Sequence, residues 1–470
     1  MDSAVDEPQA AAAVLHVVAV PYPGRGHINP MLNLCKAVAE KSSDGIHITF
    51  VVTEEWLDLI GSMTKPQNIS FAAIPNVVPS ERVRGRDVFG FAMAVLTNMG
   101  DPFEQLLELL QLRPALIIAD AFLPWAADVS GRRNIPVAYL WTMSASVYTL
   151  FHHFDLLAQN GHFPLHLSSV NGPSGMVDYI PGLAPSRVED LPSIIRDQEM
   201  ASAFLEIWPQ ESKGKHLIFT SIYHLESQAF DAFKHKVAFS IYNIGPATSF
   251  FKAKAATTIN SATDHTSDTD ACYLKWLDLQ SPDSVLYVSL GSFLSVSAVQ
   301  MDEIIAGLNK SGVRFMLVTR NETNGLQESC VGNGLVVEWC DQVSVLSHPC
   351  VGGFWSHCGW NSTKEAVLTG VPVLAFPIVM DQLLNAKMIV EDWRMGWRVK
   401  REEFGNVDCL VKRDDIADLV RRFMDMESPE RKELSRNARE LREASEREFA
   451  DGGSFLSNAE EFTKSILQDR

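Results

Sequence analysis

The chain has 470 residues, more than a single hydrophobic core usually organises, so two domains are expected. Hydrophobic residues make up 46% of the sequence and charged residues 21%, which is the composition of an ordinary globular protein. The net charge of −18 argues against a nucleic-acid backbone or an anionic membrane as the main partner. A local site can oppose that sign, so an anionic small ligand remains open.

The seven cysteines are spread along the chain without a Cys-x-x-Cys pair, which favours a reduced, cytoplasmic protein over a disulfide framework. The acidic N-terminus lacks the basic segment of a signal peptide. The apolar run at residues 10–20 is interrupted by His16 and is too short for a membrane span. We therefore expect a cytoplasmic protein with no membrane span.

Strand-like and helix-like segments alternate in the first half of the sequence. A helix is predicted after the first strand, with Asn29 as N-cap and Pro30 in the first turn. Apolar strands that alternate with helices are typical of a parallel sheet buried on both faces. The predicted strands of this half are residues 14–20, 46–53, 115–120 and 135–141.

A segment without apolar periodicity, residues 247–270, is rich in Ala, Ser, Thr and Asp and is predicted to be a linker. The alternation then restarts, with a helix at 299–308. Further strands are predicted within residues 284–292, 313–319, 335–339, 351–356 and 371–377. The C-terminal part is helical, with predicted caps at Asp414 or Asp415 and at Ser428, and a last amphipathic helix after residues 451–454.

These elements predict an α/β fold with two Rossmann-like parallel-sheet domains. The expected parts are an N-terminal domain (1–246), the linker (247–270), a second domain (271–450) and a C-terminal helix (451–470). Ligands in open α/β sheets bind at the carboxyl ends of strands. Three loops lie there: residues 21–30, 291–292 and 357–362.

The third of these loops leads into a predicted helix at residues 363–369. Ser362 and Glu365 have the Ser-x-x-Glu form of a capping box, so one interpretation is that they only cap this helix. The other is that the helix N-terminus binds a diphosphate, with His357 and Asn361 as further donors. Glu365 would then accept from two ribose hydroxyls.

A metal site is the third interpretation of this region, which contains His348, Cys350, His357 and Cys358. Their spacing matches no compact zinc pattern. The Asp268-Thr269-Asp270 triplet falls in the expected linker, so we do not interpret it as a manganese site. We expect no metal and no cofactor, and Cys358 is interpreted as a packing residue.

Residues 339–382, which begin at Trp339 and end at Asp381-Gln382, resemble the 44-residue signature box of plant family 1 UDP-glycosyltransferases, enzymes of secondary metabolism. Residues 26–30, 288–292 and 451–454 resemble the same family. The resemblance implies a monomer with a GT-B fold, in which two Rossmann-like domains face a cleft. It implies that residues 1–246 bind the acceptor, that residues 271–450 bind the UDP-sugar, and that the C-terminal helix packs back on the first domain. It also implies inverting transfer of glucose from UDP-glucose to a hydroxyl or carboxyl of a small lipophilic acceptor, without a metal.

The resemblance further implies which residues bind the donor. The uridine would be bound by Trp339, Cys340, Gln342 and Glu365. The diphosphate would be bound by Ser292, His357, Trp360, Asn361 and Ser362. The sugar would be contacted by Thr142, Asp381 and Gln382, and a terminal Gln is associated with glucose in this family. Three positions depart from the family's usual residues: Lys364 stands where an apolar or small residue is common, Met380 replaces a residue that is often aromatic or small, and Trp355 is bulkier than usual.

His27 and Asp120 are the candidate catalytic pair. Residues 24–29 lack the third glycine of a dinucleotide-binding loop, since position 29 is Asn29. His27 either caps a helix or acts as a general base on the acceptor hydroxyl, and Asp120 either caps a segment or orients that histidine. The resemblance identifies the two as the family's catalytic histidine and its charge-stabilising aspartate.

Three other functions remain open from the sequence. One is a catalytically idle UDP-sugar-binding regulatory protein, which the presence of both His27 and Asp120 disfavours. Another is a sugar-nucleotide epimerase of the same fold, against which the signature box argues. An NAD-linked oxidoreductase would require a complete glycine-rich loop, which the sequence lacks.

Overall fold

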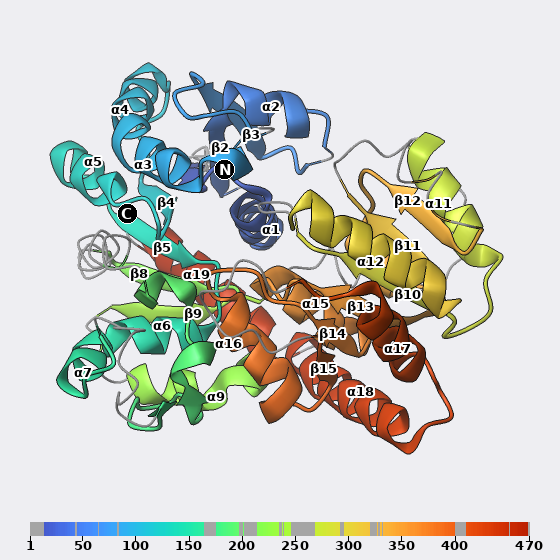
Figure 1. Cartoon of the computed structure of the whole chain (residues 1–470). Helices are drawn as coiled ribbons and strands as arrows, with labels where there is room; N and C mark the ends of the chain where they lie inside the picture. The colour runs from blue at the N-terminus through green and yellow to red at the C-terminus, as the bar shows by residue number, and fades with distance from the viewer. Residues whose placement is uncertain are drawn as a thin grey trace, which may run out of the picture. The chain divides into compact units, whose positions relative to one another are not determined.

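The computed structural model describes most of the chain in two compact units (Figure 1). By contacts, unit 1 comprises Met1–Leu140, Gln210–Leu217 and Ser457–Arg470, and unit 2 comprises Trp141–Pro209 and Ile218–Leu456. The described residues are 14–42, 45–63, 65–81, 84–163, 175–196, 201, 214–234, 237, 239–245, 268–291, 296–319, 327, 330, 332–399, 410–450 and 452–468.

The first sheet has seven strands in the order β3-β2-β1-β4-β5-β8-β9. Its strands are β1 (Leu15–Val20), β2 (Ile46–Thr53), β3 (Ile69–Ile74), β4 (Leu116–Asp120), β5 (Val137–Trp141), β8 (His216–Phe219) and β9 (Ser240–Asn243). The pairs that join β3 to β2, β2 to β1, β1 to β4 and β4 to β5 are parallel. The chain leaves β1 first toward β2 and later toward β4, so the switch point of a doubly wound sheet lies between β1 and β4.

The four strands predicted in this half are confirmed, whereas β3, β8 and β9 were not predicted. The helices around this sheet in unit 1 are α1 (Arg25–Lys41), α2 (Glu54–Ile60), α3 (Val88–Asn98), α4 (Gly100–Leu109) and α5 (Trp125–Arg133). Those of unit 2 in this half are α6 (Ala145–His152), α7 (Phe154–Gln159) and α9 (Tyr223–Phe233). A short antiparallel pair, β6 (Met176–Val177) and β7 (Ser186–Arg187), precedes two 3-10 turns, η2 (Val188–Asp190) and η3 (Ser193–Arg196).

The predicted start of the first helix at Asn29 and Pro30 is wrong. Helix α1 begins at Arg25, with Gly24 as its extended N-cap. The N–H groups of His27 and Ile28 already donate to the Gly24 carbonyl, at 2.9 Å and 2.8 Å, so the backbone turns helical directly after β1. Pro30 therefore lies inside the helix, where it lacks the N–H that would bond to the preceding turn. His27 consequently sits in the first helical turn.

The second sheet has six strands in the order β12-β11-β10-β13-β14-β15, all in parallel pairs. Its strands are β10 (Val285–Ser289), β11 (Arg314–Val318), β12 (Gly334–Val337), β13 (Val351–Ser356), β14 (Val373–Ala375) and β15 (Gly396–Arg398). The five predicted strands are confirmed, and only the three-residue β15 was not predicted. Its helices are α11 (Asp268–Asp278), α12 (Ala298–Ser311), α14 (Gln342–Leu346), α15 (Trp360–Thr369), α16 (Gln382–Lys387), α17 (Arg413–Phe423) and α18 (Pro429–Phe449). Helix α11 starts at Asp268, inside the segment predicted as a linker; residues 247–267 lie outside the described residues.

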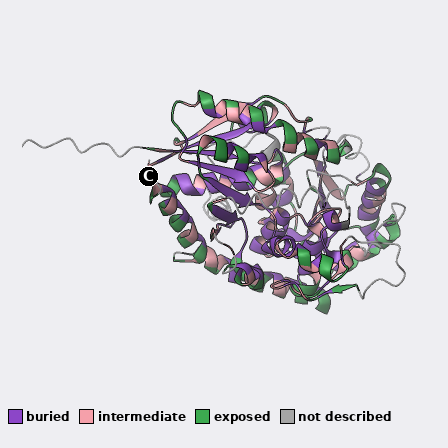
Figure 2. Ribbon diagram, turned by 90° about the vertical axis from the view of Figure 1, so that its left-hand side faces the viewer, coloured by how far each residue is buried: buried purple, intermediate pink, exposed green. Residues whose placement is uncertain are grey.

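Alternate residues of β10 face opposite layers of helices, as the two-residue period of a strand requires. Leu286 and Val288 pack with apolar residues of α12 and α17, which lie side by side in Figure 1. Val285 and Tyr287 pack with residues of α15 and α18 on the other face. Both faces of this strand are therefore buried, which explains its continuous apolar sequence. Figure 2 shows the same pattern, with buried strands and exposed residues along the outer sides of the helices.

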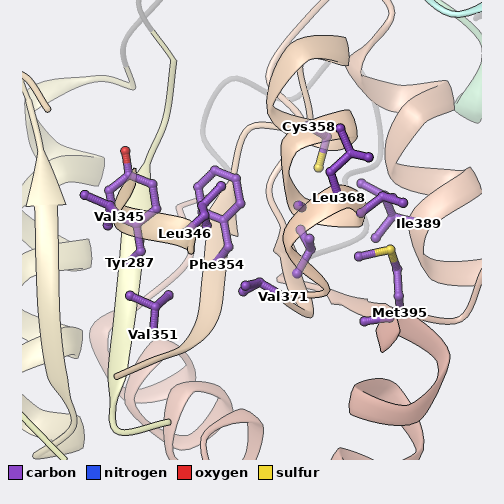
Figure 3. Close-up of a cluster of buried hydrophobic side chains, with 14 of the residues drawn as sticks. Tyr287, Val345, Leu346, Val351, Phe354, Cys358, Leu368, Val371, Ile389 and Met395 are labelled. Carbon is purple, nitrogen blue, oxygen red and sulfur yellow. The ribbon is translucent and has the colours of Figure 1, made fainter. Parts of the chain in front are cut away.

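Cys358 belongs to the core on the α15 side of the second sheet (Figure 3). Its side chain is fully buried, and burial raises the pKa of the thiol to about 12. The rings of Tyr287 and Phe354 stack nearby, with centroids 5.1 Å apart. The interpretation of Cys358 as a packing residue is confirmed.

The helical C-terminal part begins with α17, whose N-cap is Lys412 rather than Asp414 or Asp415; both aspartates lie in its first turn. Ser428 caps α18 as predicted, accepting from the Arg431 N–H at 3.2 Å. Helix α19 (Ser454–Gln468) buries the predicted stripe Phe455, Ala459, Phe462 and Ile466. Among the helices of the described ranges, none is both long and apolar enough to cross a bilayer.

Within unit 1, α19 is held by one ion pair and by ring packing. Lys41 Nζ lies 2.8 Å from Glu460 Oε1, and the ring of Phe462 lies edge-on to that of His216 with centroids 5.7 Å apart. Phe462 is fully buried, whereas the ion pair is partly exposed and contributes little. The apolar contact therefore dominates the docking of this helix.

We expect Phe462→Ala to lower the free energy of unfolding by about 3–5 kcal/mol, because it leaves a cavity in the core of unit 1. Lys464→Ala, at an exposed position of the same helix, should change it by less than about 0.5 kcal/mol. Urea unfolding followed by circular dichroism measures both. Equal effects of the two substitutions would contradict this account of the helix.

Candidate active site

In unit 1, His27 and Asp120 form a hydrogen-bonded pair. Strands β1 and β4 are parallel neighbours, with Val20 opposite Ala119, so their carboxyl ends lie together. His27 stands in the first turn of α1 after β1, and Asp120 is the last residue of β4. The His27 Nδ1 lies 2.8 Å from Asp120 Oδ2. The carboxylate is fully buried, whereas the His27 side chain is 22% exposed.

The surroundings of the pair fix its geometry. Asp120 Oδ1 accepts from the Phe122 N–H at 3.1 Å. The rings of Tyr22 and Phe122 have centroids 5.0 Å and 5.7 Å from that of His27. Because Nδ1 faces a carboxylate, it carries the proton in the neutral imidazole, and Nε2 is then the basic nitrogen. The arrangement can accept a proton from a hydroxyl that approaches Nε2.

In unit 2, the loop after β13 turns at Cys358, which has a positive φ of 65°. Helix α15 therefore begins at Trp360, with Gly359 as N-cap and no side-chain cap. The predicted capping box is wrong, because Ser362 and Glu365 lie two and five residues beyond the first helical residue. Both instead bind the side chain of Gln342, whose Nε2 donates to Ser362 Oγ at 2.9 Å and to Glu365 Oε2 at 2.6 Å.

The strained turn at Cys358 is stabilised by hydrogen bonds. A positive φ in a residue other than glycine costs about 1–3 kcal/mol. The Cys358 N–H donates to Ser356 Oγ at 3.1 Å, and its carbonyl accepts from Thr363 Oγ1 at 3.3 Å and from Asn385 Nδ2 at 2.9 Å. The same Asn385 nitrogen donates to Asp381 Oδ2 at 2.8 Å. Asn385 therefore joins the turn after β13 to the end of the signature box.

The loop that carries Asp381 and Gln382 is also fixed from both sides. Met380 has a positive φ of 60°. Its N–H donates to Ser193 Oγ at 2.7 Å, and its carbonyl accepts from the Ser193 N–H at 3.1 Å. Gln382 Oε1 accepts from two backbone N–H groups, those of Ile378 at 2.8 Å and Val379 at 3.0 Å. This fixes the amide orientation, so Gln382 can offer its Nε2 to a ligand as a donor.

His357 fits a place beside an anion. Burial lowers the pKa of its imidazole to about 4, so the ring is neutral near pH 7. Its buried Nδ1 has no hydrogen-bond partner within the described residues. Gly291 has a positive φ of 89° and lies against this ring, since a Cβ there would be 2.7 Å from Nε2. A ligand oxygen at the N-terminus of α15 could satisfy the orphaned nitrogen.

The remaining candidate residues differ in how far they are exposed to solvent. Trp339 is 53% exposed, which leaves its ring free to stack on a ligand. Cys340 is buried with its Sγ 3.3 Å from the Tyr287 hydroxyl, so its backbone is the part available for recognition. Trp360 and Thr142 are buried, and Asn361 is half-buried in the first turn of α15. Ser292 lies outside the described residues.

Two positioning residues escaped the sequence analysis. Asn385 lies four residues after Asp381, a helical spacing that could have drawn attention to it. Ser193 is far from Met380 in the sequence, and no local pattern marks it. Among the described His, Cys, Asp and Glu residues, no group of three is placed to hold a metal ion.

Two doubly wound parallel sheets, with a helix N-terminus and a carboxylate at the carboxyl end of β13, are typical of nucleotide-binding α/β enzymes. A family model described as "UDP-glucoronosyl and UDP-glucosyl transferase" matches residues 259–410. UDP-glycosyltransferase 87A2 of Arabidopsis thaliana is 46% identical over 456 residues, which are 96% of each chain. The 7-deoxyloganetin glucosyltransferase of Catharanthus roseus is 30% identical over 480 residues, again 96% of each chain.

Solved structures agree with this assignment. The structure of Phytolacca americana UGT2 complexed with UDP-2fluoro-glucose and pterostilbene has a TM-score of 0.77 and 25% identity, and covers 97% of this chain and 100% of that one. Os79 from O. sativa, in complex with U2F and trichothecene, has a TM-score of 0.77 and 26% identity, with 96% and 100% covered. The chain therefore belongs to the plant UDP-glycosyltransferases, enzymes with the GT-B fold. The predicted family, fold class and enzyme class are confirmed.

We expect Asn385→Ala to lower the free energy of unfolding by about 1–3 kcal/mol, because the buried Cys358 carbonyl and Asp381 carboxylate lose their shared donor. The affinity for UDP-glucose should fall as well, since both loops would move. Asn437→Ala is the matched control, because Asn437 Nδ2 also donates to a backbone carbonyl, that of Arg394, but this hydrogen bond is exposed to solvent. Urea unfolding and isothermal titration measure the two effects, and an unaltered Asn385→Ala protein would contradict the assignment.

Proposed function

We propose that the protein transfers glucose from UDP-glucose to a hydroxyl or carboxyl group of a small lipophilic acceptor, with inversion at the anomeric carbon. The hydrogen bond between His27 and Asp120 is the observation that carries this proposal, because it supplies an oriented base. The pterostilbene and trichothecene complexes of the similar structures support a small lipophilic acceptor. Gln382 supports glucose as the sugar, because its Oε1 accepts from two backbone N–H groups and its Nε2 is left as the donor.

The reaction follows from the roles of these groups. His27 Nε2 takes the proton of the acceptor hydroxyl, and the oxygen attacks the anomeric carbon of the α-linked sugar from the opposite face. The bond to the diphosphate breaks, which yields a β-glucoside and UDP. Asp120 stabilises the imidazolium that forms, as in other carboxylate–histidine pairs. No metal takes part in this scheme.

The donor is held by residues of unit 2. Trp339 stacks on the uracil, the backbone of Cys340 and the side chain of Gln342 lie along the uridine, and Glu365 accepts from the ribose hydroxyls. The diphosphate lies at the N-terminus of α15, where free N–H groups and the helix dipole favour negative charge. The residues proposed around it are Ser292, His357, Trp360, Asn361 and Ser362. Thr142, Asp381 and Gln382 contact the sugar, and the residues 1–246 supply the acceptor pocket.

A panel of phenolic and terpenoid alcohols, incubated with UDP-glucose and read by mass spectrometry, tests the function. We expect His27→Ala to lower the transfer rate about 100- to 10,000-fold, the usual worth of a general base, while UDP affinity stays nearly unchanged. His224→Ala, at an exposed histidine of unit 2, is the control for an unspecific effect.

Two results would refute parts of the proposal. Transfer by His27→Ala at near the wild-type rate would remove His27 from the role of base. Products formed with UDP-galactose or UDP-xylose but never with UDP-glucose would overturn the inference drawn from Gln382.

Glu365 makes donor binding depend on pH. Burial raises the pKa of its carboxyl to about 7, although the Gln342 hydrogen bond and the Lys364 charge oppose the shift. Ribose hydroxyls donate to the ionised form, so binding lowers that pKa, and below pH 7 a proton must leave as UDP-glucose binds. We expect the affinity to fall by up to about tenfold for each pH unit below 7.

Isothermal titration of UDP-glucose at pH 8, 7 and 6 measures this slope, because the diphosphate of UDP-glucose does not itself titrate there. Burial lowers the pKa of Lys364 to about 7 as well. A variant is therefore needed to show which of the two residues causes the pH dependence. Glu365→Gln should bind more weakly at pH 8 and lose the slope. If the slope persists in Glu365→Gln, another group is responsible.

A further inference from the structure

A buried lysine lies within α15, next to the residue proposed to bind the ribose. Lys364 is 2% exposed. An ammonium removed from water is costly unless it is hydrogen-bonded. The partners of Lys364 therefore indicate why the chain retains a cation here.

The ammonium is bound to one residue outside the helix. Lys364 Nζ donates to the carbonyl of Thr220 and, at 3.0 Å, to the Thr220 hydroxyl. It also lies 5.9 Å from the ring centroid of Trp360, one turn earlier in the helix. An ammonium has three N–H donors, and here two are used by Thr220 while an aromatic face lies beside the charge. Lys364 thus links α15 to the residue that follows β8.

Thr220 is in turn joined to the loop that carries Thr142. The Thr220 N–H donates to the carbonyl of Trp141 at 3.3 Å, and Trp141 precedes Thr142 directly. The route from the ammonium to this loop therefore passes through a single residue. Thr142 itself is buried.

A second connection, between Ser221 and the start of α6, is made by the carboxylate of Glu226. The hydroxyl of Ser221 donates to it, and it accepts from the N–H groups of Ala145 and Ser146 at 2.9 Å and 2.8 Å. These two N–H groups open α6, where a helix dipole favours a negative charge. The backbone of Glu226 leaves the helical region within α9, with φ −138° and ψ 27°, where its carboxylate meets α6.

Lys364 and Glu226 are each hydrogen-bonded to one of two adjacent residues. Burial lowers the pKa of Lys364, and the negative charges of Glu365 and then Glu226 oppose that shift. Burial raises the pKa of the Glu226 carboxyl, and its hydrogen bonds to Ser221, Ala145 and Ser146 oppose that shift. Thr220 and Ser221, adjacent in the chain, hold one charge each.

We propose that Lys364 is a positioning residue for the donor sugar. Through Thr220 it holds the loop of Thr142, proposed to contact the sugar, in register with the helix that carries Ser362 and Glu365. This inference rests on the proposed function, because the roles of α15 and Thr142 come from it. It adds a residue that contacts neither the nucleotide nor the sugar.

The proposal separates two parts of donor binding. The uridine diphosphate is held by other residues of α15 and the signature box, and Lys364 acts on them only through its charge, which lowers the pKa of the Glu365 carboxyl. The sugar also needs the loop of Thr142, whose position would relax without the link. Misplacing a reacting group by about 1 Å can cost about 100-fold in rate. Loss of Lys364 should therefore reduce the part of the binding affinity that the sugar contributes. It should leave the part that the uridine diphosphate contributes nearly unchanged.

Lys364→Met, which keeps the length and apolar stem of the side chain, tests this separation by isothermal titration with UDP and with UDP-glucose. The titrations are done at about pH 8.5, above the pKa of Glu365, so that this carboxyl is ionised with and without the lysine charge. We expect UDP affinity to change less than about threefold, while the affinity advantage of UDP-glucose over UDP and the kcat for transfer each fall about tenfold or more. Lys387→Met is the matched control. Lys387 is also buried, 3% exposed, but its Nζ is paired with Asp392 at 2.7 Å.

Equal weakening of UDP and UDP-glucose by Lys364→Met, or the same pattern in Lys387→Met, would overturn the proposal. If Lys364→Met does not fold, Thr220→Val removes one acceptor of the ammonium and is expected to show the same separation to a smaller degree. A Thr220→Val protein with an unchanged advantage of UDP-glucose would likewise overturn it. A wild-type protein that binds UDP-glucose but transfers to no acceptor would refute the proposed function instead, and the binding comparison would still decide the role of Lys364.

Discussion

The left-handed turn at Cys358 determines where α15 begins, and the geometry of the proposed donor-binding corner follows from it. A residue with a side chain is held at φ 65° only because the carbonyl and N–H of Cys358 are bonded to Thr363, Asn385 and Ser356. The turn starts the helix at Trp360, with Gly359 as its N-cap. It also frees Ser362 and Glu365 from capping, so that Gln342 can bind both. The strain is thus located where an anion would bind.

Much of the fold could be predicted because the strands of both sheets are buried on two faces. A continuous apolar run such as that of β10 leaves few other structures available. The short strands β9 and β15 carry too few residues for such a pattern, and their pairing is decided by neighbours distant in the sequence. The predicted helix starts were wrong for a related reason. Asn29 and Ser362 are good capping residues, but the tertiary path fixed the caps at Gly24 and Gly359.

The sequence predicted the residues of the candidate site whose own side chains carry the chemistry. It did not predict the residues that only hold other residues in place. His27 and Asp120 follow two strands that the sequence identifies, so their meeting at 2.8 Å follows from a parallel order. Ser193, which holds both the N–H and the carbonyl of Met380, leaves no mark in the sequence because a serine in a short turn is unremarkable. Contacts of this kind depend on the folded path of the chain between them.

The proposed diphosphate site offers dipoles rather than a side-chain cation of α15. The one cation of α15, Lys364, is directed to Thr220, and burial keeps His357 neutral near pH 7. The negative charge would then be met by N–H dipoles, which are fixed by the fold and need not reorganise as charge builds on the leaving UDP. Dipoles oriented in this way also avoid a strong ground-state attraction for the diphosphate. A strongly acidic protein can in this way bind the diphosphate of UDP-glucose and still release UDP as product.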